Sequence, residues 1–190
     1  MEVLLSVLIG IGLAAAVGFR VFVPFLIVSV AALSGHLELS SGFEWIGTWY
    51  ALVAFAVASC LEIASYWVPW LDNMLDVIAT PAAVVAGTVI AASVVTGISP
   101  FLRWSLAVIA GVGVAGVVQS ATVALRGTST LTTGGVANPA VSTAELGGSV
   151  VTSVLSIAMP VVAVLLVALA VFVLVTRMRR SRGMRAGRAG

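Results

Sequence analysis

Hydrophobic residues in this chain form long runs, and polar residues collect in short segments between them. Five runs are long enough for an apolar helix: residues 3–33, 46–66, 75–96, 104–125 and 150–176. A helix needs about 20 apolar residues to cross the roughly 30 Å hydrocarbon core of a bilayer. The pattern therefore predicts an all-α integral membrane protein with about five transmembrane helices.

The first run is the longest, and a single upright helix of its length would measure about 46 Å. Because Arg20 and Pro24 interrupt it, we expect a helix that either tilts strongly or breaks near Pro24 into a span and a half-helix. These alternatives leave open whether the run crosses the membrane once or twice. A signal peptide is a third alternative, but Glu2 is acidic and no basic residue precedes the run.

Aromatic and arginine residues mark the ends of the runs. All five tryptophans and both tyrosines fall at predicted boundaries, where amphipathic rings prefer the membrane interface. Most of the arginines follow the last run, in residues 177–190. Arginine is enriched on the cytoplasmic side, so we expect a helical domain of residues 1–176 and a disordered, basic, cytoplasmic tail. With five crossings, residues 67–74 and 126–149 then face outward.

The composition supports the membrane class and excludes several other classes of protein. The chain has 190 residues, of which 61% are hydrophobic and 8% are charged, and its mean hydropathy is +1.22. Since a soluble domain carries roughly 25% charged residues, we exclude a disordered chain, a disulfide scaffold and a nucleic-acid-binding domain. The single cysteine, Cys60, has no partner, and the sequence indicates no cofactor.

Small residues recur at every fourth position in three of the runs. They are Gly10, Ala14 and Gly18; Ala83, Gly87 and Ala91; and Ala107, Gly111 and Ala115. Such stripes let helix backbones approach closely in lipid, although an alanine- and glycine-rich chain also produces them by chance. They favour a tight bundle. Pro160 lies well inside the fifth run and is expected to kink that helix.

A few ionisable residues fall within or beside the apolar runs, where each costs about 2.5–3.5 kcal/mol on insertion scales. Arg20 lies near the middle of the first run, where it either snorkels at a helix break or pairs with a buried acid. Glu62 lies near the end of the second run, where the helix dipole disfavours an acid. Asp72 and Asp76 are four residues apart at the start of the third run, and helix capping explains them as well as a site does.

Residues 126–149 combine glycine, threonine and serine with only two charges, Arg126 and Glu145. This composition suits a re-entrant or broken segment whose free backbone groups line a polar cavity, and a flexible surface linker is the alternative. Together with the charges in the runs, it predicts a polar centre in one half of the membrane. The candidate ion- or substrate-binding residues are Arg20, Glu62, Asp72, Asp76, Arg126, Thr133, Asn138 and Glu145.

These residues also carry a resemblance to a known family. The chain contains Gly12-Leu-Ala-Ala-Ala-Val-Gly-Phe-Arg20-Val-Phe-Val-Pro24, then Leu61-Glu62-Ile63 and Pro69-x-x-Asp72-x-x-x-Asp76, and finally Arg126 followed by Thr132-Thr-Gly-Gly-Val-Ala-Asn138-Pro139 and Glu145. In this order they resemble the bacterial domain-of-unknown-function family 4126, over nearly the whole chain except the tail. The resemblance implies a small multi-spanning protein of the bacterial inner membrane and no particular activity.

Three classes of function fit this sequence. The first is a transporter or channel for a small ion or solute, and a cation or proton is favoured because the candidate residues include four acids and two arginines. Carboxylate and hydroxyl oxygens would suit Na⁺, Mg²⁺ or Ca²⁺ better than zinc. A path through only five spans would need a second copy, which favours a homo-oligomer in the lipid bilayer.

The second class is an enzyme acting on lipid or isoprenoid substrates, because Asp72 and Asp76 have the spacing of a metal-binding carboxylate pair. No second acidic motif, lysine or catalytic histidine accompanies them, so the sequence favours a protein that is not an enzyme. The third class is a non-catalytic membrane scaffold or assembly partner. In that case the buried charges serve only the specificity of the fold.

Overall fold

The computed structural model describes the backbone of residues 1–65 and 69–186 and the side chains of residues 1–65, 78–173 and 176. The described residues form helices joined by short turns, without a strand. The elements are α1 (Glu2–Phe19), α2 (Phe22–Leu33), the 3₁₀ turn η1 (Glu44–Gly47), α3 (Trp49–Ser65), α4 (Pro69–Val94), α5 (Pro100–Ile109), the π-helical segment η2 (Ala110–Ala115), α6 (Gly116–Thr133), α7 (Asn138–Ala158) and α8 (Pro160–Ala186). The predicted all-α fold is confirmed.

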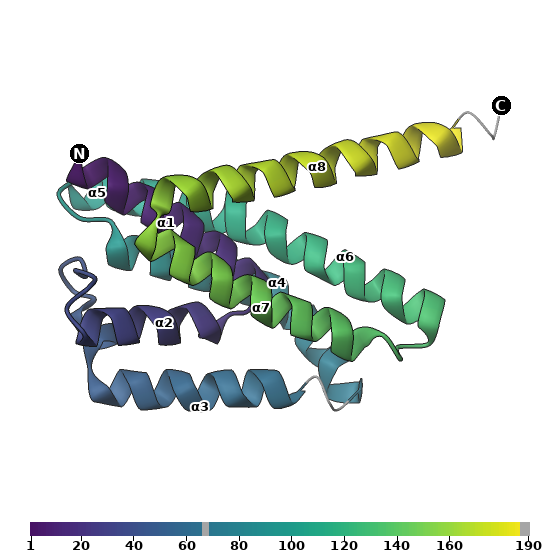
Figure 1. Ribbon diagram of the computed structural model, residues 1–190, viewed down its shortest axis with the longest axis horizontal. Helices are drawn as coiled ribbons and strands as arrows, with labels where there is room; N and C mark the ends of the chain where they lie inside the picture. The colour runs from purple at the N-terminus through teal and green to yellow at the C-terminus, as the bar shows by residue number, and fades with distance from the viewer. Residues whose placement is uncertain (66–68, 187–190) are drawn as a thin grey trace.

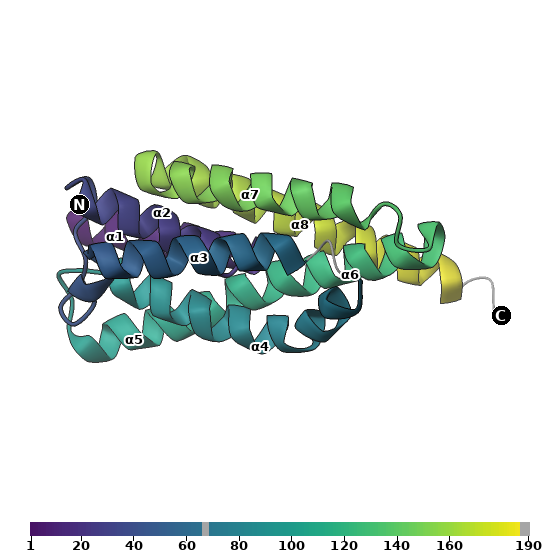
Figure 2. The same ribbon diagram turned by 90° about the horizontal axis from the view of Figure 1, so that it is seen from below.

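Helices that follow one another in the chain run antiparallel along the long axis of the molecule (Figure 1). The segments α5, η2 and α6 join into one long rod of 34 residues. The N-terminus, the α2–α3 connection, the α4–α5 connection and the α7–α8 turn lie at one end of the bundle, and Figure 2 shows the same arrangement from below. We call this the N-terminal end. The α6–α7 turn and the C-terminal end of α8 lie at the opposite end, which we call the tail end.

The break predicted in the first apolar run is confirmed, and it falls at Arg20. Arg20 has extended backbone angles, with φ −148° and ψ 130°, and the chain then reverses into α2. Pro24 lies in the first turn of α2, where proline is tolerated. The proline ring would clash with the carbonyl group of Arg20, four residues earlier, if the helix continued through both. The first run therefore forms a full helix and a shorter returning one.

The prediction for the fifth apolar run was wrong, because Pro160 separates two helices instead of kinking one. α7 ends at Ala158 and α8 begins at Pro160, and the chain reverses direction between them. This extra reversal brings the 126–149 segment to the same end of the bundle as the tail, whereas the sequence placed them on opposite sides. α8 also continues to Ala186, into the segment predicted to be a disordered tail.

Residues 126–149, predicted to be a re-entrant segment or a linker, form the two facing ends of a helical hairpin instead. α6 continues to Thr133, and α7 begins at Asn138 with a proline in its first turn, a favoured position for this residue. Gly134 and Gly135 make the turn with φ angles of 62° and 87°, which glycine adopts without a steric penalty. The segment therefore joins two long helices directly.

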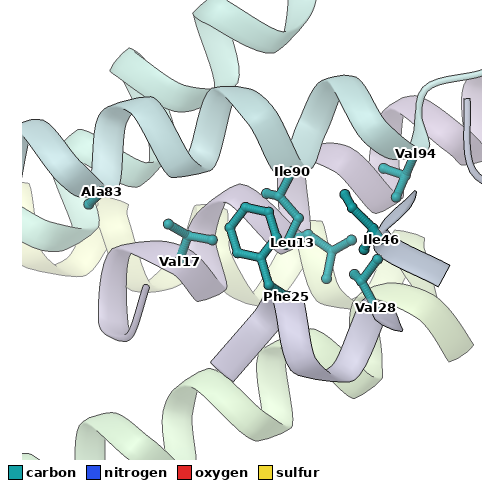
Figure 3. Close-up of a cluster of buried hydrophobic side chains, with 8 residues drawn as sticks. All are labelled: Leu13, Val17, Phe25, Val28, Ile46, Ala83, Ile90 and Val94. Carbon is teal, nitrogen blue, oxygen red and sulfur yellow. The ribbon is translucent and has the colours of Figure 1, made fainter. Parts of the chain in front are cut away.

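The small-residue stripes meet as predicted, around the central helix α1. A Cβ atom added to Gly87 of α4 would lie 2.6 Å from the Cβ of Ala115, and one added to Gly18 of α1 would lie 2.6 Å from the Cβ of Val118. Next to this contact, larger apolar side chains from α1, α2, η1 and α4 form a buried cluster (Figure 3). The members of this cluster are Leu13, Val17, Phe25, Val28, Ile46, Ala83, Ile90 and Val94.

Three helices in the described part of the chain are long and apolar enough to cross a membrane by length and composition. They are Glu2–Phe19, the rod Pro100–Thr133 and Asn138–Ala158. Shorter apolar helices cover Phe22–Leu33, Trp49–Ser65, Ile78–Val94 and Pro160–Val173. These helices agree with the apolar runs of the sequence, apart from the reversal at Pro160.

Candidate functional site

An ion pair between α6 and α7 forms the centre of the candidate site. The Nε atom of Arg126 donates to both carboxylate oxygens of Glu145, at 2.9 and 3.1 Å, and one terminal nitrogen of Arg126 also contacts this carboxylate. Each residue is 4% exposed. Arg126 lies two turns before the end of α6 and Glu145 two turns after the start of α7, so the hairpin brings them face to face.

Arg20 approaches the same carboxylate from the break between α1 and α2. Its Nη2 atom lies 3.7 Å from a carboxylate oxygen of Glu145 and donates to the carbonyl and the hydroxyl group of Ser142. Arg20 is 1% exposed, and its side chain is the largest among those that are almost fully buried. The structure therefore pairs Arg20 with a buried acid, and that acid is Glu145. We call Arg20, Arg126, Glu145 and Ser142 the arginine cluster.

Glu62 binds the start of α2. Its carboxylate accepts hydrogen bonds from the backbone N–H groups of Val21 and Phe22, at 2.7 and 3.1 Å. The first N–H groups of a helix have no partner within the helix, and the dipole there favours a negative charge. An acid near the C-terminal end of α3 is thus stabilised by the N-terminal end of the antiparallel α2. Glu62 holds the backbone that immediately follows Arg20.

Two predicted site residues lie at the α6–α7 turn, apart from the arginine cluster. The hydroxyl group of Thr133 donates to the carbonyl group of Ser129 at 2.8 Å, and the side-chain nitrogen of Asn138 donates to the hydroxyl group of Thr130 at 3.1 Å. These bonds stabilise the hairpin turn. The side chains of Asp72 and Asp76, also predicted to belong to the site, lie outside the described residues.

The polar inner face of α7 was not predicted from the sequence. The most buried residues of this helix are Glu145, Ser149, Ser153 and Ser156, whereas Val150, Val151 and Val154 are exposed. Successive polar residues are separated by three or four positions, a spacing that places them on one face of a helix. That spacing was the available signal, but the segment containing Ser142 and Glu145 was read as irregular and separate from the helix.

The surface of the bundle also contains apolar hollows. The larger, of about 660 Å³, runs between α4 and the α6 part of the rod, and Val84, Gly116 and Leu125 line it. A smaller one of about 210 Å³ lies between α6, α7 and α8, beside Phe19. Among the described residues, no group of three or more His, Cys, Asp or Glu side chains could hold a metal ion.

Comparison with known proteins gives a family and no function. No curated protein and no solved structure matches the chain. The family described as Domain of unknown function (DUF4126) matches residues 7–180, which include every residue of the arginine cluster and exclude only the two ends. This match covers far more than half of the chain. The chain therefore belongs to the DUF4126 family.

Proposed function

We propose that this protein is an integral membrane protein that carries a small ion, with a proton or small cation favoured, through the arginine cluster. The observation that carries the proposal is the position of this cluster at the break between α1 and α2, inside the bundle. Ionisable residues inside a membrane commonly mark an ion pathway, and discontinuous helices commonly form the binding site of transporters.

The distribution of apolar side chains supports the membrane location. α7 buries serine and exposes valine, the reverse of a helix in a water-soluble protein. In the part of α8 whose side chains are described, Leu165, Leu169 and Phe172 are exposed. Contiguous exposed apolar surface of this kind is rare in soluble monomers and is stable against lipid tails.

Aromatic side chains support a membrane boundary near the N-terminal end of the bundle. The exposed rings there are Trp45, Trp49, Tyr50, Phe101 and Trp104. Rings of this type favour the level of the lipid headgroups. α2 ends near this level and has 12 residues, so its start, next to the break at Arg20, lies about 18 Å deeper. In a hydrocarbon core of roughly 30 Å, that depth is well inside the membrane.

The arginine-rich tail supports the orientation that we propose. Cytoplasmic segments next to membrane helices are enriched in arginine, so the tail end faces the cytoplasm of a bacterial cell and the N-terminal end faces outward. The α6–α7 turn then also faces the cytoplasm, because it lies at the tail end. In this orientation the break at Arg20 lies inside the membrane, between its two surfaces.

Flux measurements with purified protein in liposomes test the proposal. We expect an imposed proton or Na⁺ gradient to dissipate faster with the wild-type protein than in empty vesicles, and Glu145→Gln to remove most of this flux. Glu38→Gln is the matched control, because it makes the same chemical change at an exposed residue in a loop. Wild-type flux equal to that of empty vesicles for every ion tested would refute the transport proposal.

The alternative is a scaffold in which the buried charges only define the fold. The observation that favours it is the paired geometry of Arg126 and Glu145, which is also that of a structural ion pair. A scaffold predicts that Glu145→Gln lowers the yield of folded protein while the wild-type protein carries no ion. The liposome experiment and the folded yield together separate the two functions.

A further inference from the structure

The inner face of α7 is polar over most of the helix. Going away from the tail end, the residues on this face are Ser142, Glu145, Ser149, Ser153 and Ser156. From the first to the last is about 21 Å along the helix axis, a large part of a hydrocarbon core of roughly 30 Å. Ser149, Ser153 and Ser156 are each 0% exposed. We call these five residues the serine face.

Most hydroxyl groups on the serine face have a partner in the protein. The hydroxyl group of Ser149 donates to the carbonyl oxygen of Ala16 at 3.0 Å, and that of Ser156 donates to the carbonyl oxygen of Thr152 at 2.6 Å. The hydroxyl group of Ser153 has no hydrogen-bond partner in the described part of the chain. Leaving a buried hydroxyl group unsatisfied costs roughly 1–3 kcal/mol, so this position favours a bound water molecule.

The serine face packs against the backbone of α1, where small residues let the two helices approach closely. A Cβ atom added to Gly12 would lie 2.2 Å from the hydroxyl oxygen of Ser156. The space that a side chain of α1 would fill is therefore taken by a hydroxyl group. So close a contact leaves no room for a hydrated metal ion. One end of the face is the carboxylate of Glu145, which lies between two arginines.

We infer that the serine face is a hydrated path that relays protons between Glu145 and the N-terminal end of the bundle. Each water molecule or hydroxyl group on the path accepts a proton on one side and releases its own proton on the other. The Glu145 carboxylate accepts a proton from the first member of the path and releases it to water at the tail end, so that no group is changed after a complete transfer. This inference rests on the proposed function and specifies the proton as the ion.

Reactivity of introduced cysteines with Ag⁺ tests whether the face is hydrated. Thiols react as thiolates, which form in water and not in lipid. In a Cys60→Ala background, we expect Ser153→Cys to react about tenfold faster than Val154→Cys, the neighbour that is exposed toward the lipid. Ag⁺ is close to a water molecule in size, so it can enter a narrow path. Equal rates for the two cysteines would overturn the inference whatever the protein transports.

Proton flux in liposomes tests whether the path conducts. We expect Ser153→Val to lower the flux about tenfold, which corresponds to roughly 1.4 kcal/mol on the barrier. Val154→Ala, on the outward side of the same helix, should leave the flux unchanged. Ser153→Ala is the second variant, because it removes the hydroxyl group without adding bulk. We expect it to lower the flux less than valine does, since a water molecule can take the place of the hydroxyl group.

The combination of variants separates this inference from the proposed function. If Glu145→Gln stops the flux and Ser153→Val leaves it intact, the proposed function stands and the serine face is not the path. If the wild-type protein carries Na⁺ but no protons, the inference fails while ion transport remains. If it carries no ion, both fail.

Discussion

The central helix α1 has two faces of similarly small residues that meet very different partners. On one face Gly10, Ala14 and Gly18 pack against the small residues of α4 and the rod. On the other face Gly12 and Ala16 pack against the serine face of α7. Close approach of helices in lipid is stabilised by van der Waals contacts and by interhelical hydrogen bonds. α1 makes van der Waals contacts on the first face and accepts a hydrogen bond from α7 on the second.

The comparison shows that small residues alone do not determine what an interface does. Among the side chains that the structure describes, no ionisable group lies opposite the apolar face of α1, and this face holds helices together. The polar face ends at the arginine cluster, where each charge is matched by another because an unpaired buried charge is costly. The function that we propose therefore belongs to the α1–α7 interface, and the α1–α4 interface keeps α1 in place.

The largest effect on stability is expected from breaking the polar face at its charged end. Glu145→Ala removes the carboxylate that lies between Arg20 and Arg126. Removing one partner of a buried ion pair typically costs about 3–5 kcal/mol, because the remaining charge stays buried. Thermal unfolding in detergent should show this loss, and Glu38→Ala in the exposed loop should not. Equal midpoints for the two variants would mean that the cluster contributes little to the fold.

The contact between α4 and the rod, which pack together beside the apolar face of α1, should give the next largest effect. A Cβ atom at Gly111 would lie 2.6 Å from the backbone nitrogen of Thr88 and 2.6 Å from the carbonyl oxygen of Val84. Backbone atoms cannot rotate away, so we expect Gly111→Ala to destabilise the protein by about 1–3 kcal/mol.

Gly113→Ala is the matched control for this prediction. It lies in the same π-helical segment, and a Cβ atom added there would meet nothing within 4 Å. Alanine favours a helix over glycine by about 1 kcal/mol, so this variant should unfold at the same temperature as the wild type or higher. If Gly111→Ala is as stable as Gly113→Ala, close packing between the rod and α4 contributes little to the stability of the bundle.

Much of the apolar face could be predicted from the sequence, because its signals are local. Small residues at every fourth position lie on one side of a helix whatever the topology, and the three stripes do meet. The break in the first run was also local, since Arg20 and Pro24 lie four residues apart. The reversal at Pro160 was not predictable in this way. An apolar run that contains a proline has the same pattern whether the helix bends or the chain turns back.

The charged residues of the site stood out in the sequence because apolar runs surround them, but their pairing did not. The ion pair between Arg126 and Glu145 depends on the α6–α7 hairpin. This hairpin was not predicted, because residues 126–149 were read as a re-entrant segment or a linker. Glu62 was recognised as unfavourable for its own helix, and its partner is the start of another helix. Ser149 and Ser153 were overlooked because serine is common in chains of this composition and carries no charge.

A smaller effect is expected where the polar face meets a glycine. Gly12→Ala would place a Cβ atom 2.2 Å from the hydroxyl oxygen of Ser156, and a side chain can move where a backbone cannot. We expect a loss of about 1 kcal/mol in the free energy of unfolding. The double variant Gly12→Ala/Ser156→Ala should recover part of this loss, because the hydroxyl oxygen is gone while the Cβ atom of residue 156, 2.9 Å away, remains. Additive losses in the double-mutant cycle would show that the two residues are not in contact.

The smallest effect is expected at the α6–α7 turn, which belongs to neither face of α1. Asn138→Ala removes the hydrogen bonds between this side chain and the hydroxyl group of Thr130, at the tail end of the bundle. Substitutions at such positions usually change stability by about 0.5 kcal/mol or less, so the unfolding temperature should hardly move. Ion flux in liposomes should also equal that of the wild type. If Asn138→Ala reduces the flux as strongly as Glu145→Gln, the path continues past the arginine cluster to the turn. The polar face of α1 would then be only one part of a longer path through the hairpin.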